Sequence, residues 1–268
     1  MLIGRKIKSA VFGPLKLRLP LPDRKISKQI AGKKVTAVRR RAKYVVIELD
    51  SASLLVIHLG MTGRLGLFPS GTPPAKHDHA SWLLDNDLEM RFNDTRRFGS
   101  IQVFDSEEAA AEFFETLGPD PFWAAFSAPY LADLARGRNL PVKSFLMDNR
   151  IVTGIGNIYA SEILFASRVN PTTSVRELTP GQWLKIVENS RIILTAAIAC
   201  GGSTIADYVN SSGEKGYFQT KLKVYGRDRE PCPKCCEPIV QVRLGGRASY
   251  YCPNCQPDVR PRKTKKKP

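Results

Sequence analysis

The sequence predicts an α+β protein with a sheet-rich N-terminal domain, a helical domain and a small C-terminal metal-binding hairpin. Up to about residue 105, β-branched runs alternate with polar residues and are broken by Gly, Pro and Asn-Asp, a pattern typical of a β-sandwich or barrel. Helical patterns follow, and two CxxC pairs come last. With 268 residues and 43% hydrophobic composition, the chain is long enough for two packed cores.

The charge balance indicates a polyanionic partner. Lys and Arg number 41 against 25 Asp and Glu, which gives a formal net charge of +16. Nucleic acid fits this balance, and so do a ribosome or an anionic membrane surface. No apolar run approaches the roughly 20 residues of a membrane span, and the opening "MLIGRKIKSA" carries charges where a signal peptide needs its apolar core. We therefore expect a soluble intracellular protein without a signal peptide.

Helical segments begin after the sheet-rich part. "SEEAAAEFFETLG" and "SAPYLADLARG" both have helical patterns, and "PDPFW" separates them, so we expect a domain boundary between residues 105 and 130. The strongest helix signal is "TPGQWLKIVENSRIILTAAIACGG", which Thr179 and Gln182 open as a capping box. Together with "GIGNIYASEILFASRV" it predicts a helix-turn-helix-like pair. The expected buried stripe of the helix that Thr179 and Gln182 open is Trp183, Val187, Leu194 and Ile198.

Two CxxC pairs near the C-terminus have the spacing of zinc ligands. Four thiolates close the coordination sphere of the metal, so the ion is structural and leaves no open position for a catalytic water. Cys236 follows the first pair directly and is interpreted as a bystander. Between the pairs, Gly245 and Gly246 predict a tight hairpin turn, with Arg247 immediately after it. The predicted Zn²⁺ ligands are Cys232, Cys235, Cys252 and Cys255.

Two turns of the sheet-rich part combine apolar and basic side chains. "HLGMTG" places Met61 in a glycine-flanked turn, where filling of the core is the alternative to an exposed role. "NDTRRFG" groups Arg96, Arg97 and Phe98, which suits contact with a nucleic-acid backbone and stacking on a base. Each residue alone indicates little.

Other single residues are weaker signals. Lys43 lies in the strand-like run "RRRAKYVV", where a lysine normally faces solvent. His77 and His79 in "KHDH" favour phosphate contact or structural hydrogen bonds over metal binding. "GIGN", which ends at Asn157, could present the positive end of a helix dipole to a phosphate, although such glycines more often serve packing.

Taken in order, "RRRAKY", "HLGMTG", "KHDH", "DTRRFG", "LMDNRIVTGIGNIYASEILF", "GGST", "SGEKGYF", "VYGR" and "GGRASYYCPNC" resemble the formamidopyrimidine-DNA glycosylase family over almost the whole chain. The resemblance implies a β-sandwich over residues 1–115 that lacks its first helix, and a helix-two-turn-helix domain over 116–218. It further implies a zinc-finger hairpin over 219–257 and a basic, disordered tail over 258–268.

The resemblance also implies an activity. It predicts base-excision repair, with removal of oxidised purines such as 8-oxoguanine and formamidopyrimidines from duplex DNA and strand nicking by β,δ-elimination. Met61, Arg96 and Phe98 match the wedge that faces the orphaned base when the damaged nucleotide is flipped out. "SSGEKGYF" matches the loop that closes over the everted purine. A monomer is expected, in the cytoplasm or nucleoid.

Further roles follow by the same resemblance. Asn157 matches a phosphate ligand, and Lys143 and His77 match additional DNA contacts, as do Arg96 and Arg97. Lys43 matches the lysine assigned to β-elimination. Arg247 matches the arginine that the zinc hairpin carries to the DNA backbone beside the lesion and that is assigned to δ-elimination.

The N-terminus departs from the family pattern. Family members begin with Pro-Glu, whose proline amine attacks the sugar C1′ while the glutamate handles protons. This chain begins "MLIGRKI" and has neither residue. Two explanations are open: the start is recorded too late and the natural protein has its proline, or the chain is a non-catalytic, lesion-recognising DNA-binding protein. A remote alternative is an RNA-binding zinc-ribbon protein, which charge and CxxC spacing would permit.

Overall fold

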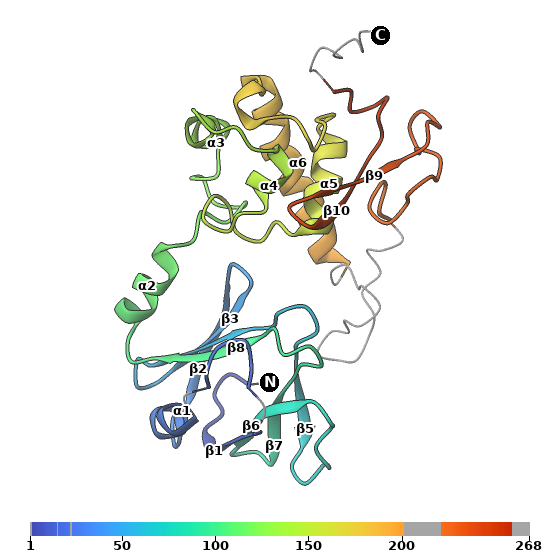
Figure 1. Ribbon diagram of the computed structural model, residues 1–268. Helices are drawn as coiled ribbons and strands as arrows, with labels where there is room; N and C mark the ends of the chain where they lie inside the picture. Colours follow the sequence, from blue (N-terminus) through green and yellow to red (C-terminus); the bar gives the residue numbers. More distant parts are fainter. Residues whose placement is uncertain (1, 15, 22, 201–220, 259–268) are drawn as a thin grey trace, which may run out of the picture. The chain divides into compact units, whose positions relative to one another are not determined.

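The computed structural model describes residues 2–14, 16–21, 23–200 and 221–258 (Figure 1). Within these ranges the chain divides into two compact units at Thr116 and Leu117. The described residues up to Thr116 form the sheet unit, and those from Leu117 onward form the helical unit, which includes the zinc hairpin. The predicted "GGST" and "SSGEKGYF" segments lie outside the described residues, and so does the basic tail except for Asp258.

The sheet unit contains two four-stranded antiparallel sheets, which confirms the predicted sandwich. Strands adjacent in one sheet are β1 (Ile7–Phe12), β6 (Asp78–Leu84), β7 (Leu88–Asn93) and β5 (Arg64–Pro69). Strands adjacent in the other are β2 (Val35–Arg41), β3 (Tyr44–Leu49), β4 (Leu54–His58) and β8 (Ser100–Phe104). Alternating side chains from both sheets form one core that includes the fully buried Ile47, Trp82 and Phe92.

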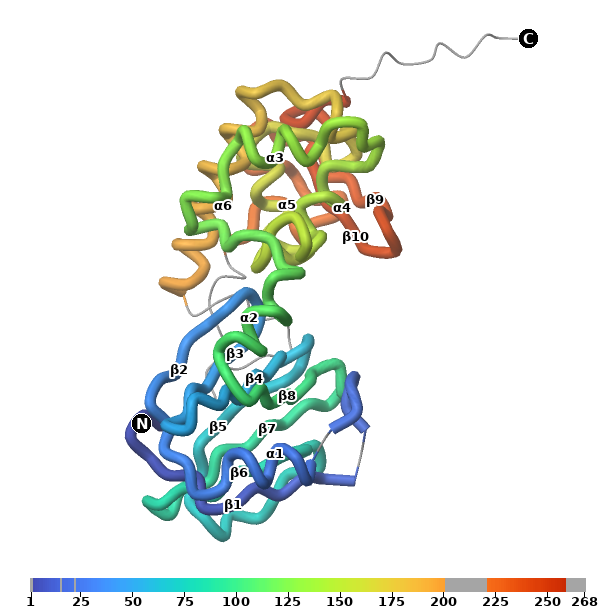
Figure 2. The backbone as a smooth tube through the Cα atoms, turned by 90° about the vertical axis from the view of Figure 1, so that its left-hand side faces the viewer, coloured from blue at the N-terminus to red at the C-terminus, as the bar shows by residue number. Residues whose placement is uncertain are grey.

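Two helices complete the sheet unit. Helix α1 (Asp23–Ile30) contacts β1 and β8, an edge strand of each sheet (Figure 2). It buries Ile26 and Ile30 in the common core. The β-rich interpretation of this region did not anticipate α1, although its two isoleucines at an i, i+4 spacing are a helical signal. Helix α2 (Glu107–Glu115) has Ser106 as its N-cap and confirms the predicted helix there.

The helical unit is built around a buried helix, α5 (Asn157–Ala166), in which seven of ten residues are buried. Helix α6 (Pro180–Ala199) packs on α5 and on α3, and begins with the predicted capping box between Thr179 and Gln182. The other helices of this unit are α3 (Ala128–Ala135), α4 (Val142–Leu146) and the 3₁₀ turn η1 (Val175–Glu177).

One element of the predicted α6 stripe is wrong. Trp183, Val187 and Leu194 are buried in the core of the helical unit, but Ile198 is 62% exposed. In the last turn of α6 it is Ala197 that faces inward. The buried face continues from Leu194 at an i+3 step to Ala197, whereas the predicted i+4 step to Ile198 leaves that face.

The zinc hairpin consists of β9 (Val240–Leu244) and β10 (Arg247–Tyr251), paired in antiparallel register. Gly245 and Gly246 have φ values of +54° and +75°, the left-handed conformation that a two-residue hairpin turn requires. The predicted turn is thereby confirmed. In the part of the chain that the structure describes, no helix has the length and apolarity needed to cross a bilayer.

Candidate nucleic-acid interface

Met61 lies at an exposed turn between β4 and β5 rather than in the core. Its side chain is 56% exposed, and that of Phe98, in the turn between β7 and β8, is 44% exposed. The guanidinium carbon of Arg96 lies 4.7 Å from the centre of the Phe98 ring, a cation–π geometry. These three residues, which we call the wedge, expose two large apolar groups and a cation on the sheet unit.

A buried carboxylate joins the two turns that carry the wedge. Asp94 is fully buried, and its Oδ1 accepts a hydrogen bond from the Thr62 hydroxyl next to Met61. The backbone N–H of Gly99 donates to Asp94 Oδ2 at 2.8 Å, and that of Arg96 donates to Thr62 Oγ1 at 3.1 Å. Because one carboxylate accepts donors from both turns, it fixes the spacing between Met61 and Phe98.

The two turns also touch directly through backbone. Gly60 has a φ of +66°, and a Cβ at this position would lie 2.7 Å from the backbone of Phe98 and Gly99. Only glycine permits this approach without displacing the second turn. The sequence singled out this glycine as a flank of Met61, but its contact with a residue nearly forty positions away in the chain could be seen only in the fold.

His58 supports the same turn. Its Nδ1 accepts the backbone N–H of Gly60 at 3.0 Å. Burial, followed by the positive charges of Arg18 and Lys43, lowers the pKa of His58 below its ordinary value, while Asp94 opposes the shift. The imidazole is therefore neutral at pH 7, as an acceptor must be.

Lys43 and His77 lie beside the wedge turns. Lys43 is exposed in the two-residue turn between β2 and β3, after Ala42 with its φ of +55°. The predicted position of Lys43 inside a strand is wrong, because the chain reverses there. Its charge acts on the pKa of His58. His77 is half-buried, and its carbonyl accepts the Asp94 N–H at 3.0 Å. Arg97 is exposed in the same turn as Phe98, with a φ of +57°.

In the helical unit, Asn157 lies in the first turn of α5 and donates from Nδ2 to the hydroxyl of Tyr225 at 3.3 Å. The ring of Tyr225 packs edge-on against Tyr250 of β10, with 5.0 Å between centroids. A buried glutamate of α5, Glu162, accepts the backbone N–H groups of residues 223–225 at 2.8–3.0 Å. The segment with Tyr225 is thereby held against the start of α5.

Lys143, a predicted DNA contact, has a buried side chain that faces the zinc hairpin in this structure, and its contact with DNA stays a prediction. Its side chain is only 1% exposed, and Nζ donates to the Ala248 carbonyl at 3.1 Å and to Ser249 Oγ at 2.8 Å. Burial, and secondarily the charge of Arg247, lower the pKa of Lys143 from 10.5 to about 7. In this structure Lys143 connects α4 to the hairpin strand β10 and is not available at the surface.

The free energy of unfolding of the natural chain, minus that of Lys143→Met, should become more positive as the pH rises from 7 to 10. Over this range the unfolded lysine binds a proton that the folded lysine lacks, so raising the pH favours the folded natural chain, by at most about 1.4 kcal/mol per pH unit. Thermal melts at several pH values measure the difference. Lys185→Met, at an exposed position of α6, is the matched control and should show no such trend. A pH-independent effect of Lys143→Met would contradict the assignment.

The four predicted cysteines come together. The Sγ atoms of Cys232, Cys235, Cys252 and Cys255 all lie within 4.8 Å of one another, with three separations of 3.5–3.9 Å. A tetrahedral zinc with Zn–S bonds of about 2.3 Å spaces its sulfurs by about 3.8 Å. The cluster therefore fits one structural zinc ion, and Cys236, which is exposed and outside it, is the predicted bystander.

The zinc cluster is anchored to the helices. Gln256 is fully buried, and its Nε2 donates to the Val169 carbonyl at 2.7 Å while its Oε1 accepts the Cys252 N–H at 3.0 Å. Phe165 of α5 packs with Cys232 and Cys252 in a small apolar cluster. The metal site thus holds β10, and the exposed Arg247 at its start, on the surface of the helical unit.

The chain matches the models of known protein domains along most of its length. Three family models match successive parts of the chain: the formamidopyrimidine-DNA glycosylase N-terminal domain over residues 1–101, the H2TH domain of the same glycosylase over 117–209, and a zinc finger found in FPG and IleRS over 229–257. The order of these models, together with the sandwich, the helical unit and the four-cysteine hairpin, defines a zinc-containing DNA glycosylase fold.

Individual relatives give the family. The formamidopyrimidine-DNA glycosylase of Acidithiobacillus ferrooxidans is 43% identical over 94% of this chain and 93% of its own length. That of Vibrio parahaemolyticus is 42% identical over 95% and 93%. The chain belongs to the formamidopyrimidine-DNA glycosylase family. Two solved structures have a similar fold, and each match covers 96% of this chain and 94% of the solved chain. One is a Lactococcus lactis FPG mutant with DNA that contains Fapy-dG, at 28% identity and a TM-score of 0.89. The other is Lactococcus lactis Fpg with DNA that contains an abasic site, at 29% identity and a TM-score of 0.88.

Sequence reasoning missed the residues that position the site. Asp94, Thr62, His58 and Glu162 were quoted within motifs but were given no role. A charged or polar residue within an apolar segment or a turn could have indicated these roles. Glu162 in the apolar helix "NIYASEILFA" is an example. Its partners, the N–H groups of residues 223–225, could not be read from that signal.

Proposed function

We propose that this chain is a base-excision repair glycosylase that recognises oxidised purines, 8-oxoguanine and formamidopyrimidines, in duplex DNA and nicks the strand by β,δ-elimination. The observation that carries the proposal is the exposed wedge, whose two turns are joined by the buried Asp94 carboxylate, in a chain of this family. Extruding a base costs a few kcal/mol, and side chains that fill the vacated stack offset that cost. The proposed state of the protein is a monomer, and its proposed location is on the DNA of the nucleoid.

Each wedge residue suits a part of this task. Met61 and Phe98 are apolar and exposed, as insertion into a base stack requires, and Arg96 adds donors for the edge of the orphaned base. Arg97 and His77 lie beside them and are suited to contacts with the flanking phosphates.

The other proposed roles belong to Asn157, Arg247 and Lys43. Asn157, at the start of α5, is suited to a phosphate because its amide and the helix N-terminus both offer donors. Arg247, exposed on the zinc-held hairpin, is suited to the backbone beside the lesion and to δ-elimination. Lys43, exposed beside the wedge turns, is the proposed base of β-elimination.

Borohydride trapping tests the covalent step. In the family chemistry an amine attacks C1′ of the damaged nucleoside, the base leaves, and the resulting imine is reduced by borohydride to a stable amine that joins protein and DNA. From a chain that begins with the family's Pro-Glu, we expect an adduct with duplexes that contain 8-oxoguanine or an abasic site, and none with undamaged duplex. Peptide mapping of the adduct then identifies the reacting amine.

Binding measured in parallel separates the alternatives. Lesion-selective binding without an adduct would instead support a non-catalytic lesion-recognising protein. Preference for single-stranded RNA over the damaged duplex would support the zinc-ribbon alternative and overturn the proposal. Binding to duplex DNA should weaken steeply with salt in every DNA-binding case, since phosphate neutralisation releases counterions.

A further inference from the structure

Strand β1 is an edge of its sheet, and part of its outer side is open. On one side β1 pairs with β6. On the other, Ile7 exchanges two backbone hydrogen bonds with the chain's own residues 32 and 33, at 2.7 and 2.8 Å. Among the described strands none pairs with this outer side from Lys8 to Phe12. An open edge offers unpaired N–H and C=O groups to a further strand.

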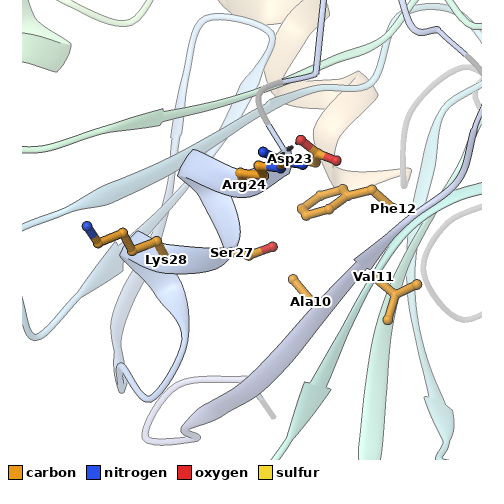
Figure 3. A pocket seen from close by; sticks show the side chains of 7 residues that line it. All are labelled: Ala10, Val11, Phe12, Asp23, Arg24, Ser27 and Lys28. Carbon is orange, nitrogen blue, oxygen red and sulfur yellow. Dashed lines mark hydrogen bonds between the residues drawn. The ribbon is translucent and has the colours of Figure 1, made fainter.

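A groove lies between this open stretch and helix α1. It has a volume of about 670 Å³ and is lined by Ala10, Val11 and Phe12 of β1 and by the first turns of α1 (Figure 3). Ala10 faces Ser27 across the groove, the Phe12 ring points toward the start of α1, and Val11 points to the other side of the strand. The size falls within the roughly 300–1,000 Å³ typical of binding pockets.

The helical wall of the groove is basic. Arg24 and Lys28 are exposed at an i, i+4 spacing on α1 and both line the groove. Across the described residues neither has an ion-pair partner, whereas Lys25 on the same helix pairs with Asp105. Asp23 contributes one negative charge, but its Oδ1 accepts the Arg24 backbone N–H at 2.7 Å. Two unpaired cations along an apolar strand favour acidic side chains in the groove's occupant.

We propose that the β1–α1 groove binds an extended acidic segment of a partner protein, which adds as a strand to the open edge of β1. The backbone groups of Lys8–Phe12 supply the main-chain pairing, as residues 32 and 33 already do at Ile7. Apolar side chains of the segment pack on Ala10 and Phe12, and its carboxylates pair with Arg24 and Lys28. This surface takes no part in the chemistry proposed above.

A charge-swap experiment on the full chain tests the proposal. The probe is a fluorescein-labelled peptide of the repeat Val-Thr-Glu-Thr, in which valine and glutamate share one face of the added strand. A second peptide has lysine in place of glutamate, and binding is followed by fluorescence anisotropy. The glutamate peptide should bind the natural chain. The double variant Arg24→Glu/Lys28→Glu should weaken it by roughly tenfold and should gain affinity for the lysine peptide. Hydrogen exchange at Lys8–Phe12 should slow when the glutamate peptide binds.

Controls separate this groove from general charge effects. Arg5→Glu/Lys34→Glu makes the same change of charge at exposed positions outside the groove lining and should leave binding unchanged. Ser27→Trp should fill the groove and abolish binding while the melting temperature is retained.

Several results would overturn the proposal. One is absence of binding at millimolar peptide, and another is binding that neither Ser27→Trp nor the charge reversal affects. If undamaged duplex DNA competes for the groove, its cations serve nucleic acid instead. If the natural chain self-associates and Ser27→Trp abolishes this, the occupant is a second copy of the chain.

Discussion

Replacing Cys252 with serine is expected to abolish zinc binding and, with it, the binding of lesion-containing duplex. Cys252 is fully buried at the metal cluster, and its N–H is bonded to Gln256, which anchors the hairpin to Val169. Structural zinc contributes about 10–16 kcal/mol of apparent binding free energy in small zinc domains. A hairpin that loses this contribution no longer holds Arg247 in place, because a two-stranded hairpin alone is marginally stable.

The order of events is part of this prediction. The helices have their own core, which includes Phe145, Ile163 and Trp183 and does not contain the cysteines. Chelation should therefore abolish lesion binding while the helical circular dichroism signal persists, and the helices should melt only at higher temperature. Zinc release, duplex affinity and circular dichroism are measured on the same samples.

Cys236→Ser is the matched control for this variant. Cys236 is one residue from a ligand but exposed and outside the cluster, so its replacement should retain zinc and binding. If Cys236→Ser releases the metal, or if Cys252→Ser retains both metal and binding, the assignment of ligands is wrong.

Replacing Asp94 with alanine should have the second-largest effect. The carboxylate accepts hydrogen bonds from the Thr62 hydroxyl and from the Gly99 N–H, and its loss leaves these donors buried without an acceptor. Hydrogen bonds to a charged group contribute about 1.5–3 kcal/mol each, and unpaired buried donors add a cost. We expect the free energy of unfolding of the sheet unit to fall by roughly 2–4 kcal/mol.

The same variant should lose selectivity for the lesion. Without the carboxylate, the turns of Met61 and Phe98 are no longer held at a fixed spacing, so the gain from filling the vacated base stack falls. The measurement is denaturant unfolding together with the affinity ratio of lesion to undamaged duplex. Non-specific binding, which depends on phosphate contacts, should change little.

Two variants calibrate the Asp94 result. Thr62→Val removes one of the donors and should give a smaller effect of the same kind. Asp105→Ala removes an aspartate whose side chain is 67% exposed and pairs with Lys25 at 3.5 Å, and it should change stability by less than about 0.5 kcal/mol. An Asp94→Ala protein with unchanged stability and selectivity would show that the two turns hold their spacing without the carboxylate.

Local sequence determined several parts of this protein by itself. The CxxC pairs specified the zinc ligands, because two residues between cysteines bring both sulfurs to one ion wherever the segment lies. The capping box of Thr179 and Gln182 and the Gly245–Gly246 turn were predicted correctly, since all of their hydrogen bonds and torsion angles are made within a few residues. Net charge indicated the polyanionic partner in the same way, as a property of composition.

Only the tertiary structure decided how the site is held. Asp94 meets Thr62 from 32 positions away, Glu162 meets the N–H of Val224 from 62, and Lys143 meets Ser249 from 106. No periodicity encodes such pairs. Lys143 shows why: whether a lysine faces solvent or a distant carbonyl depends on which strand packs over it. A buried polar group must find its partner, and that partner is chosen by the packing of the whole unit.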